Sequence, residues 1–148
     1  MNNKKMTLED FKAKAIDKYK RRILVADIEV KGFGTVPFKR PSDNDLLEYL
    51  NGAAKGAKLN KDGEIKETDV MPIAEAAKVL VYNTCSYLHD SELQESVEVI
   101  DPYDTPFTVF GVDATMNAAE KISDIFNSGE IQEEVKNSSG AEKEPQDN

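Results

Sequence analysis

The feature that most constrains the fold is one long helical pattern in the middle of the chain. Between about Val70 and Leu88, apolar side chains recur at spacings of three and four, which places them on one broad face of a helix. Thr68 or Asp69 is suited to cap its start. The face consists of Ile73, Ala76, Ala77, Leu80, Val81, Thr84 and Leu88. A face this wide must be covered by other elements, so we expect this helix to be the central, most buried part of the fold.

Shorter helical patterns lie on both sides of this central helix. Thr7 begins an amphipathic helix over residues 8 to 20, and Ser42 begins a second one. Residues 91 to 97 fit one short helical turn. Asp113 is a suitable cap for a last long helix, which Gly129 ends.

A β-hairpin is predicted at about residues 23 to 40. Apolar residues there alternate with polar ones, and Gly32-Phe33-Gly34 separates the two alternating stretches. Pro37 has no backbone N–H to donate, so the second strand is expected at an edge or beside a bulge.

Two polar stretches lack such patterns. Lys58 to Glu67 contains the turn dipeptide Asp62-Gly63 and is expected to be a loop between helices, and Gly52 and Gly56 weaken the helix before it. Residues 137 to 148 contain no large apolar residue, so burial cannot offset the entropy of ordering them. We expect a disordered acidic tail there.

The sequence therefore predicts an α+β fold that is mostly helical. Its 148 residues suit one domain, over residues 7 to 136, with about five helices and the hairpin at 23 to 40. Residues 1 to 6 are expected to be a flexible N-terminus. No internal repeat is evident.

The charge of the chain argues against nucleic-acid and membrane partners. Acidic residues outnumber basic ones 28 to 19, and the resulting net charge of −9 opposes binding to phosphate backbones and anionic lipid surfaces. A nucleic-acid-binding regulator stays an alternative if the fold gathers the basic residues Lys18, Lys20, Arg21, Arg22, Lys39 and Arg40.

The compartment is expected to be the cytoplasm. The first residues lack the apolar stretch of a secretory signal, and no run approaches membrane-spanning length. A single cysteine, Cys85, fits a reducing environment.

Cys85 and His89 are the sharpest catalytic candidates. Four residues apart on a helix, they would share one face, where a histidine lowers the pKa of a thiol. A small thiol-dependent enzyme is therefore an alternative, but the pair lacks an orienting third group and supplies only two metal ligands. We accordingly predict no enzyme, no catalytic residue, no metal and no cofactor.

A calcium-like spacing runs from Lys58 to Asp69. It places oxygen-bearing residues at EF-hand-like offsets, but Lys58 occupies the first ligand position and Asp69 replaces the bidentate Glu. A solvated turn is the expected structure. Gly32-Phe33-Gly34 lacks the third glycine of a dinucleotide-binding loop.

Apolar side chains near the C-terminus are candidates for contact with a partner protein. A groove for a partner helix and ordinary core packing both explain them. These candidates are Phe107, Phe110, Met116, Ile122 and Phe126.

The whole pattern resembles a known family. One anchor is the segment Gly34-Thr35-Val36-Pro37-Phe38-Lys39-Arg40-Pro41-Ser42, in which an edge strand leads into a helix. The other is the ending Ala119-Glu120-Lys121-Ile122-Ser123-Asp124-Ile125-Phe126-Asn127-Ser128-Gly129. Over about residues 7 to 137, the chain resembles the tail assembly chaperones of tailed bacteriophages, in particular the XkdN-like family of phages and prophages of Gram-positive bacteria.

The resemblance implies a non-enzymatic role in virion assembly. Such a chaperone binds and solubilises the long tape-measure protein, recruits tail-tube protein, acts in the cytoplasm of the bacterial host and is not part of the finished virion.

Overall fold

A computed structural model gives the structure of the chain at residues 4–59 and 65–128, with only the backbone described between 57 and 68. The predicted tail at 137 to 148 and the first three residues lie outside these ranges. The chain divides into two units, one containing Met1–Ile23 and the other formed by Leu24–Ser128. We describe each unit by itself.

The first unit contains helix α1, Leu8–Lys20. Thr7 caps it, because the Asp10 N–H donates a hydrogen bond to Thr7 Oγ1 over 3.1 Å. The helix predicted at residues 8 to 20 is confirmed. Unlike the helices of a core, α1 contains no buried residue.

The second unit begins with the predicted hairpin, formed by β1, Val25–Val30, and β2, Gly34–Lys39. The strands are antiparallel with Ile28 opposite Val36, and every second side chain is buried. Each strand of this two-stranded sheet is an edge strand, so β2 can contain Pro37, as predicted.

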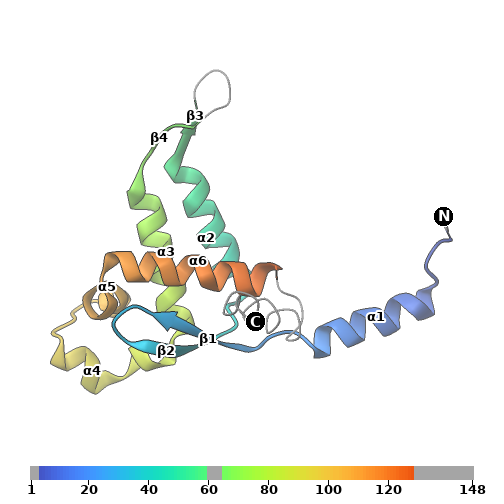
Figure 1. Ribbon diagram of the computed structural model, residues 1–148, viewed down its shortest axis with the longest axis horizontal. Coiled ribbons are helices and arrows are strands. Elements are labelled where there is room, and N and C mark those ends of the chain that lie inside the picture. Colours follow the sequence, from blue (N-terminus) through green and yellow to red (C-terminus); the bar gives the residue numbers. More distant parts are fainter. Residues whose placement is uncertain (1–3, 60–64, 129–148) are drawn as a thin grey trace, which may run out of the picture. The chain divides into compact units, whose positions relative to one another are not determined.

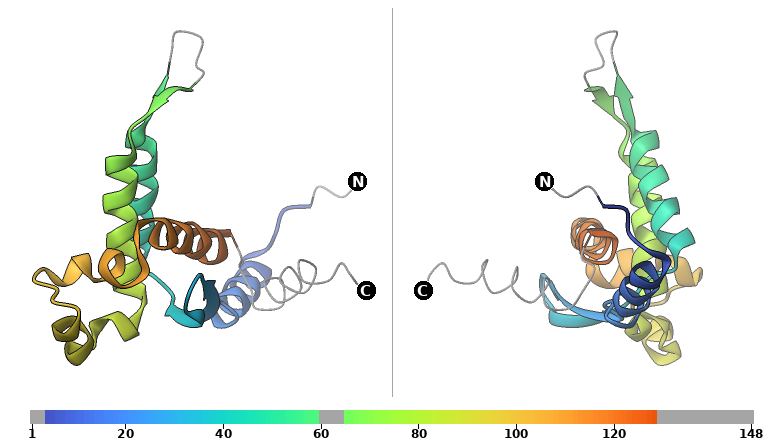
Figure 2. Two further views of the ribbon diagram at one scale, coloured as in Figure 1. Left: turned by 60° about the vertical axis from the view of Figure 1, so that its left-hand side comes forward. Right: turned by 90° about the vertical axis from the view of Figure 1, so that its right-hand side faces the viewer.

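Helices α2, Asp43–Gly56, and α3, Val70–Thr84, run side by side in Figures 1 and 2. Two glycines of α2 make the approach close. A Cβ atom added to Gly52 would lie 2.6 Å from Ala76 Cβ, and one added to Gly56 would lie 2.5 Å from Asp69 O. The two glycines that weaken α2 in isolation are therefore what allows it to pack against α3.

The predicted loop at Lys58 to Glu67 is wrong at both ends. β3, Ala57–Leu59, and β4, Ile65–Thr68, pair antiparallel (Figure 1). β3 follows the last residue of α2, and β4 leads into the start of α3. Because the paired helices bring the two chain segments together, their backbones form a ladder despite polar composition. The centre of the calcium-like spacing, residues 60–64, lies outside the described residues.

The chain after α3 is more broken than predicted. α3 ends at Thr84 and not near Leu88, and the 3₁₀ helix η1, Ser86–His89, and the short helix α4, Ser91–Ser96, follow. Cys85, the residue after the last turn of α3, has extended backbone angles. The expected short helix at 91 to 97 is confirmed.

The last elements are η2, Pro102–Asp104, α5, Thr105–Phe110, and α6, Val112–Ser128. Asp113 was expected to cap α6 but lies inside its first turn, because the helix already begins with the Thr115 N–H donating to Gly111 O. Gly111, with a φ of 95°, ends α5 and separates it from α6.

The core of the second unit lies where α3, α6 and the hairpin meet. Leu80 and Val81 of α3 are buried as predicted for the central helix. In Figure 1, α6 crosses α3 and passes over the hairpin. The predicted fold class is confirmed: the described residues form six α-helices and an N-terminal hairpin, an α+β arrangement.

Candidate functional site

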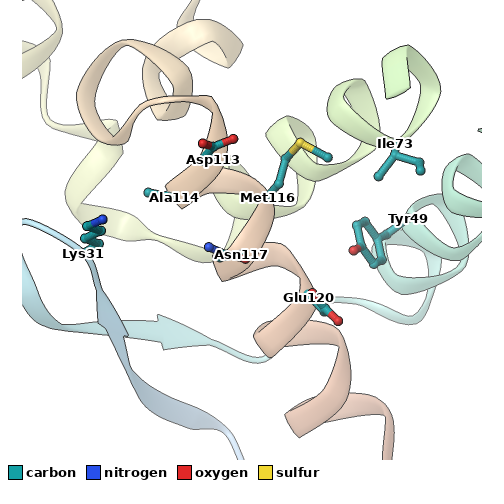
Figure 3. A pocket seen from close by; sticks show the side chains of 8 residues that line it. All are labelled: Lys31, Tyr49, Ile73, Asp113, Ala114, Met116, Asn117 and Glu120. Carbon is teal, nitrogen blue, oxygen red and sulfur yellow. The ribbon is translucent and has the colours of Figure 1, made fainter. Parts of the chain in front are cut away.

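A trough of about 470 Å³ lies on the outer face of α6 (Figure 3). One side is the end of the hairpin, and the other is the α2–α3 pair. We call it the α6 trough, and it is lined by Lys31, Tyr49, Ile73, Asp113, Ala114, Met116, Asn117 and Glu120.

The core holds α6 so that this face stays open. Ala119 and Ile122 of α6 are buried, which fixes their side of the helix inward. At the start of the helix, the Thr115 hydroxyl donates a hydrogen bond to Pro106 O over 3.0 Å, joining α6 to α5. In Figure 3, Met116 points toward Ile73 of α3 and Tyr49 of α2, so three half-buried apolar groups gather at one side of the trough.

Acidic groups surround this apolar side. Burial raises the pKa of the Tyr49 hydroxyl, and the charges of Glu120 and Asp124 raise it further. The hydroxyl therefore stays protonated at neutral pH and is a hydrogen-bond donor. Asp113 and Glu120 are exposed on the trough itself.

The sequence reinforces this acidity. Between Lys78 and Lys121 the chain contains no lysine or arginine. The acidic residues in this interval are Asp90, Glu92, Glu95, Glu98, Asp101, Asp104, Asp113 and Glu120. Of these residues, Asp113 and Glu120 line the trough, where the exposed Lys31 offsets one of their two charges. The remaining net negative charge favours a cationic or neutral apolar ligand over an anionic one.

Of the five residues predicted to contact a partner, three have accessible side chains and two are buried. Met116 lines the trough. Phe107 and Phe110 lie on α5 and are half-buried: Phe110 meets the Phe33 ring edge-on at 5.0 Å, and the Lys78 ammonium lies 5.7 Å from the centre of Phe107. Those three side chains still present accessible surface.

Ile122 and Phe126 belong to the core. They are 0% and 2% exposed, and the Arg40 guanidinium lies 5.9 Å from the Phe126 ring. As placed here, neither can contact a partner without opening the core, so packing accounts for both.

Cys85 and His89 are placed apart from any common helical face, because α3 ends before either of them. Cys85 is fully buried, and burial raises the pKa of its thiol, which disfavours the reactive thiolate. His89 stacks on Tyr82 at 4.0 Å and donates from Nε2 to Tyr82 O over 2.7 Å. Both side chains thus have packing roles.

The structure does not assemble a metal site or a cluster of the basic residues in its described part. Among the residues with described placement, no three His, Cys, Asp or Glu side chains cluster to hold a metal ion. In the basic stretch, Arg21 pairs with Asp17 at 3.3 Å and Arg22 stacks over Tyr19 at 4.1 Å. Arg40 donates to Phe126 O over 3.5 Å, within the second unit.

Sequence patterns identified Met116 but missed the rest of the trough. Tyr49, Ile73 and Glu120 come from three different helices, and no periodicity within one helix connects them. In the described part of the chain, no helix is both long and apolar enough to cross a membrane. Comparison of the chain with models of protein families, with curated proteins and with solved structures finds no match in any of the three.

Proposed function

We propose that this protein is a non-enzymatic tail assembly chaperone that holds an amphipathic helical segment of a phage tape-measure protein in the α6 trough. The trough carries the proposal, because it combines a half-exposed apolar wall with an acidic surround. The family resemblance of the two segments around Gly34 and Ile122 supplies the identity of the partner.

The apolar wall suits a helix whose exact sequence varies. Met116 is unbranched and adapts its shape, while Tyr49 adds an aromatic face and a hydroxyl donor. An amphipathic helix places residues at spacings of three, four and seven on such a surface. Basic residues beside its apolar stripe would meet Asp113 and Glu120.

The net charge of the chain supports the proposal that the chaperone keeps its complex with the tape-measure protein soluble. A tape-measure protein is long and exposes apolar helical segments before the tail forms, so a chaperone bound along it must keep the complex dispersed. A coat of molecules with a charge of −9 each would do so by mutual repulsion. On this proposal the protein acts in the host cytoplasm, brings tail-tube protein to the complex and leaves the finished tail.

Co-expression with a tape-measure protein from the same genome tests the proposal. The unmodified chain should give a soluble complex that survives gel filtration. Met116→Glu places a charge in the apolar wall and should abolish the complex, because a desolvated charge there would have no partner.

Asn44→Glu is the matched control, since it adds the same charge at an exposed position of α2 outside the trough. It should retain the complex. Absence of both complex and improved solubility with the unmodified chain would sink the proposed function. Equal binding by the Met116→Glu variant would move the site away from the trough.

A further inference from the structure

Helix α1 carries an apolar stripe whose large side chains are exposed in the part of the chain that the structure describes. Leu8, Phe11, Ala15 and Tyr19 recur at spacings of three and four and therefore share one side of the helix. The three large side chains of this stripe, Leu8, Phe11 and Tyr19, are 71%, 58% and 64% exposed. We call these four residues the α1 stripe.

The segment that carries the stripe differs in charge from the rest of the chain. Residues 1 to 22 contain eight lysines and arginines and three acidic residues, a net charge of +5. The remaining 126 residues contain the other 11 basic and 25 acidic residues, a net charge of −14. These two values sum to the −9 of the whole chain. Residues 24 to 128, the acidic body to which this basic arm is joined, contain 9 basic and 19 acidic residues, a net charge of −10, and residues 129 to 148 carry the other −4.

The α1 stripe and the α6 trough are complementary in apolar character and in net charge. Lys12 and Lys18 lie beside the stripe on the helix surface, while Lys14 and Lys20 lie farther round. The trough offers apolar contact at Met116 and negative charge at Asp113 and Glu120, and its one lining cation, Lys31, leaves a net charge of −1. Helix α1 spans about 20 Å and α6 about 25 Å at the usual rise per residue, so one helix can lie along the other.

We infer that α1 docks its stripe into the α6 trough of a second copy of this chain. The exchange is reciprocal, because each copy provides one arm and one trough, and it closes as a two-fold symmetric dimer. The charges within the contact contribute most to this association, since at physiological salt exposed charges more than about 8 Å apart are largely screened, and the net charge of the rest of the chain adds a weaker effect.

An anionic membrane is the other surface that attracts a basic amphipathic helix. The acidic body disfavours it, because docking α1 on anionic lipid brings the net charge of −10 of residues 24 to 128 toward the same surface. The same body attracts α1 when it belongs to a second copy. The observations therefore favour the protein partner.

The first experiment measures dimerisation of the full chain by sedimentation equilibrium at low and high salt. The unmodified chain should form a dimer that high salt weakens. Lys12→Glu with Lys18→Glu should weaken it at least about tenfold, which corresponds to about 1.4 kcal/mol. Because no residue of α1 is buried, this change leaves the folded second unit in place.

The matched control is Lys14→Glu with Lys20→Glu, which changes the net charge by the same amount on other sides of α1. It should weaken the dimer clearly less. Glu120→Lys added to the Lys12→Glu, Lys18→Glu chain should restore affinity. The charges on α1 and on α6 are then both reversed, so they attract each other again.

Three results would overturn the inference. One is that the chain stays monomeric at every concentration, whether α1 stays undocked or docks on its own chain. Another is equal weakening by the two lysine pairs, with no recovery on adding Glu120→Lys. The third is sedimentation of the chain with phosphatidylserine vesicles that the Lys12→Glu, Lys18→Glu change abolishes, without any dimer in their absence. The inference shares the trough with the proposed function but needs no tape-measure protein, so either can fail alone.

Discussion

Replacing Gly52 by alanine tests the close approach of α2 and α3. At an exposed helical position, this change would stabilise the fold by about 1 kcal/mol through helix propensity. At Gly52 the new Cβ would lie 2.6 Å from Ala76 Cβ and 2.9 Å from Pro72 O. Both distances are shorter than a real Cβ atom tolerates, so the helices must separate.

The expected cost follows from these contacts. Overpacking of a core costs about 1–3 kcal/mol, and the upper part of that range applies because a backbone carbonyl and a Cβ cannot swing aside. After subtracting the propensity gain, Gly52→Ala should lower the free energy of unfolding by about 2 kcal/mol. For a unit of this size, the unfolding temperature should fall by roughly 8 °C.

Urea and thermal unfolding followed by far-UV circular dichroism measure this change. Asn51→Ala, on the exposed side of the same helix, is the control and should be neutral or slightly stabilising. Adding Ala76→Gly to Gly52→Ala should show a favourable coupling of at least about 0.5 kcal/mol, since it removes one colliding atom. If Gly52→Ala stabilised the chain as Asn51→Ala does, the packing of α2 on α3 would be wrong.

Three further predictions concern stability. Glu98 has a φ of 60°, so Glu98→Gly should raise the free energy of unfolding by up to about 1 kcal/mol in urea titrations, and an unchanged or lower value would contradict this. The pKa values of Cys85, Tyr49 and Lys78 are all raised, so the folded chain keeps protons that the unfolded chain releases. Stability should therefore fall as the pH rises above about 8.5, and Cys85→Ala should remove the first part of that fall; a urea midpoint that stays level to about pH 10 would refute it. Lys78 pairs with Asp104 at 3.0 Å, so Asp104→Asn should cost about 1 kcal/mol at low salt and less at high salt; an equal cost at both would exclude the ion pair as its cause.

Local patterns predicted the elements whose structure depends on local sequence. The α1 cap at Thr7, the hairpin and the buried face of α3 each follow from residues within one short window. The β3–β4 pair does not, because its strands meet only after α2 and α3 have packed. The same holds for Gly52, whose effect changes sign once Ala76 lies opposite it.

The apolar stripe of α6 shows why the candidate site needed the structure. Periodicity put Met116, Ile122 and Phe126 together, because it reports the side of a helix and not the extent of what covers that side. Ile122 and Phe126 are 0% and 2% exposed, whereas Met116 lies nearer the start of the helix and stays half-exposed beside Tyr49. A partner helix can therefore reach only the part of the stripe that the core leaves open. For that reason Met116→Glu tests binding, while the same change at Ile122 would test only folding.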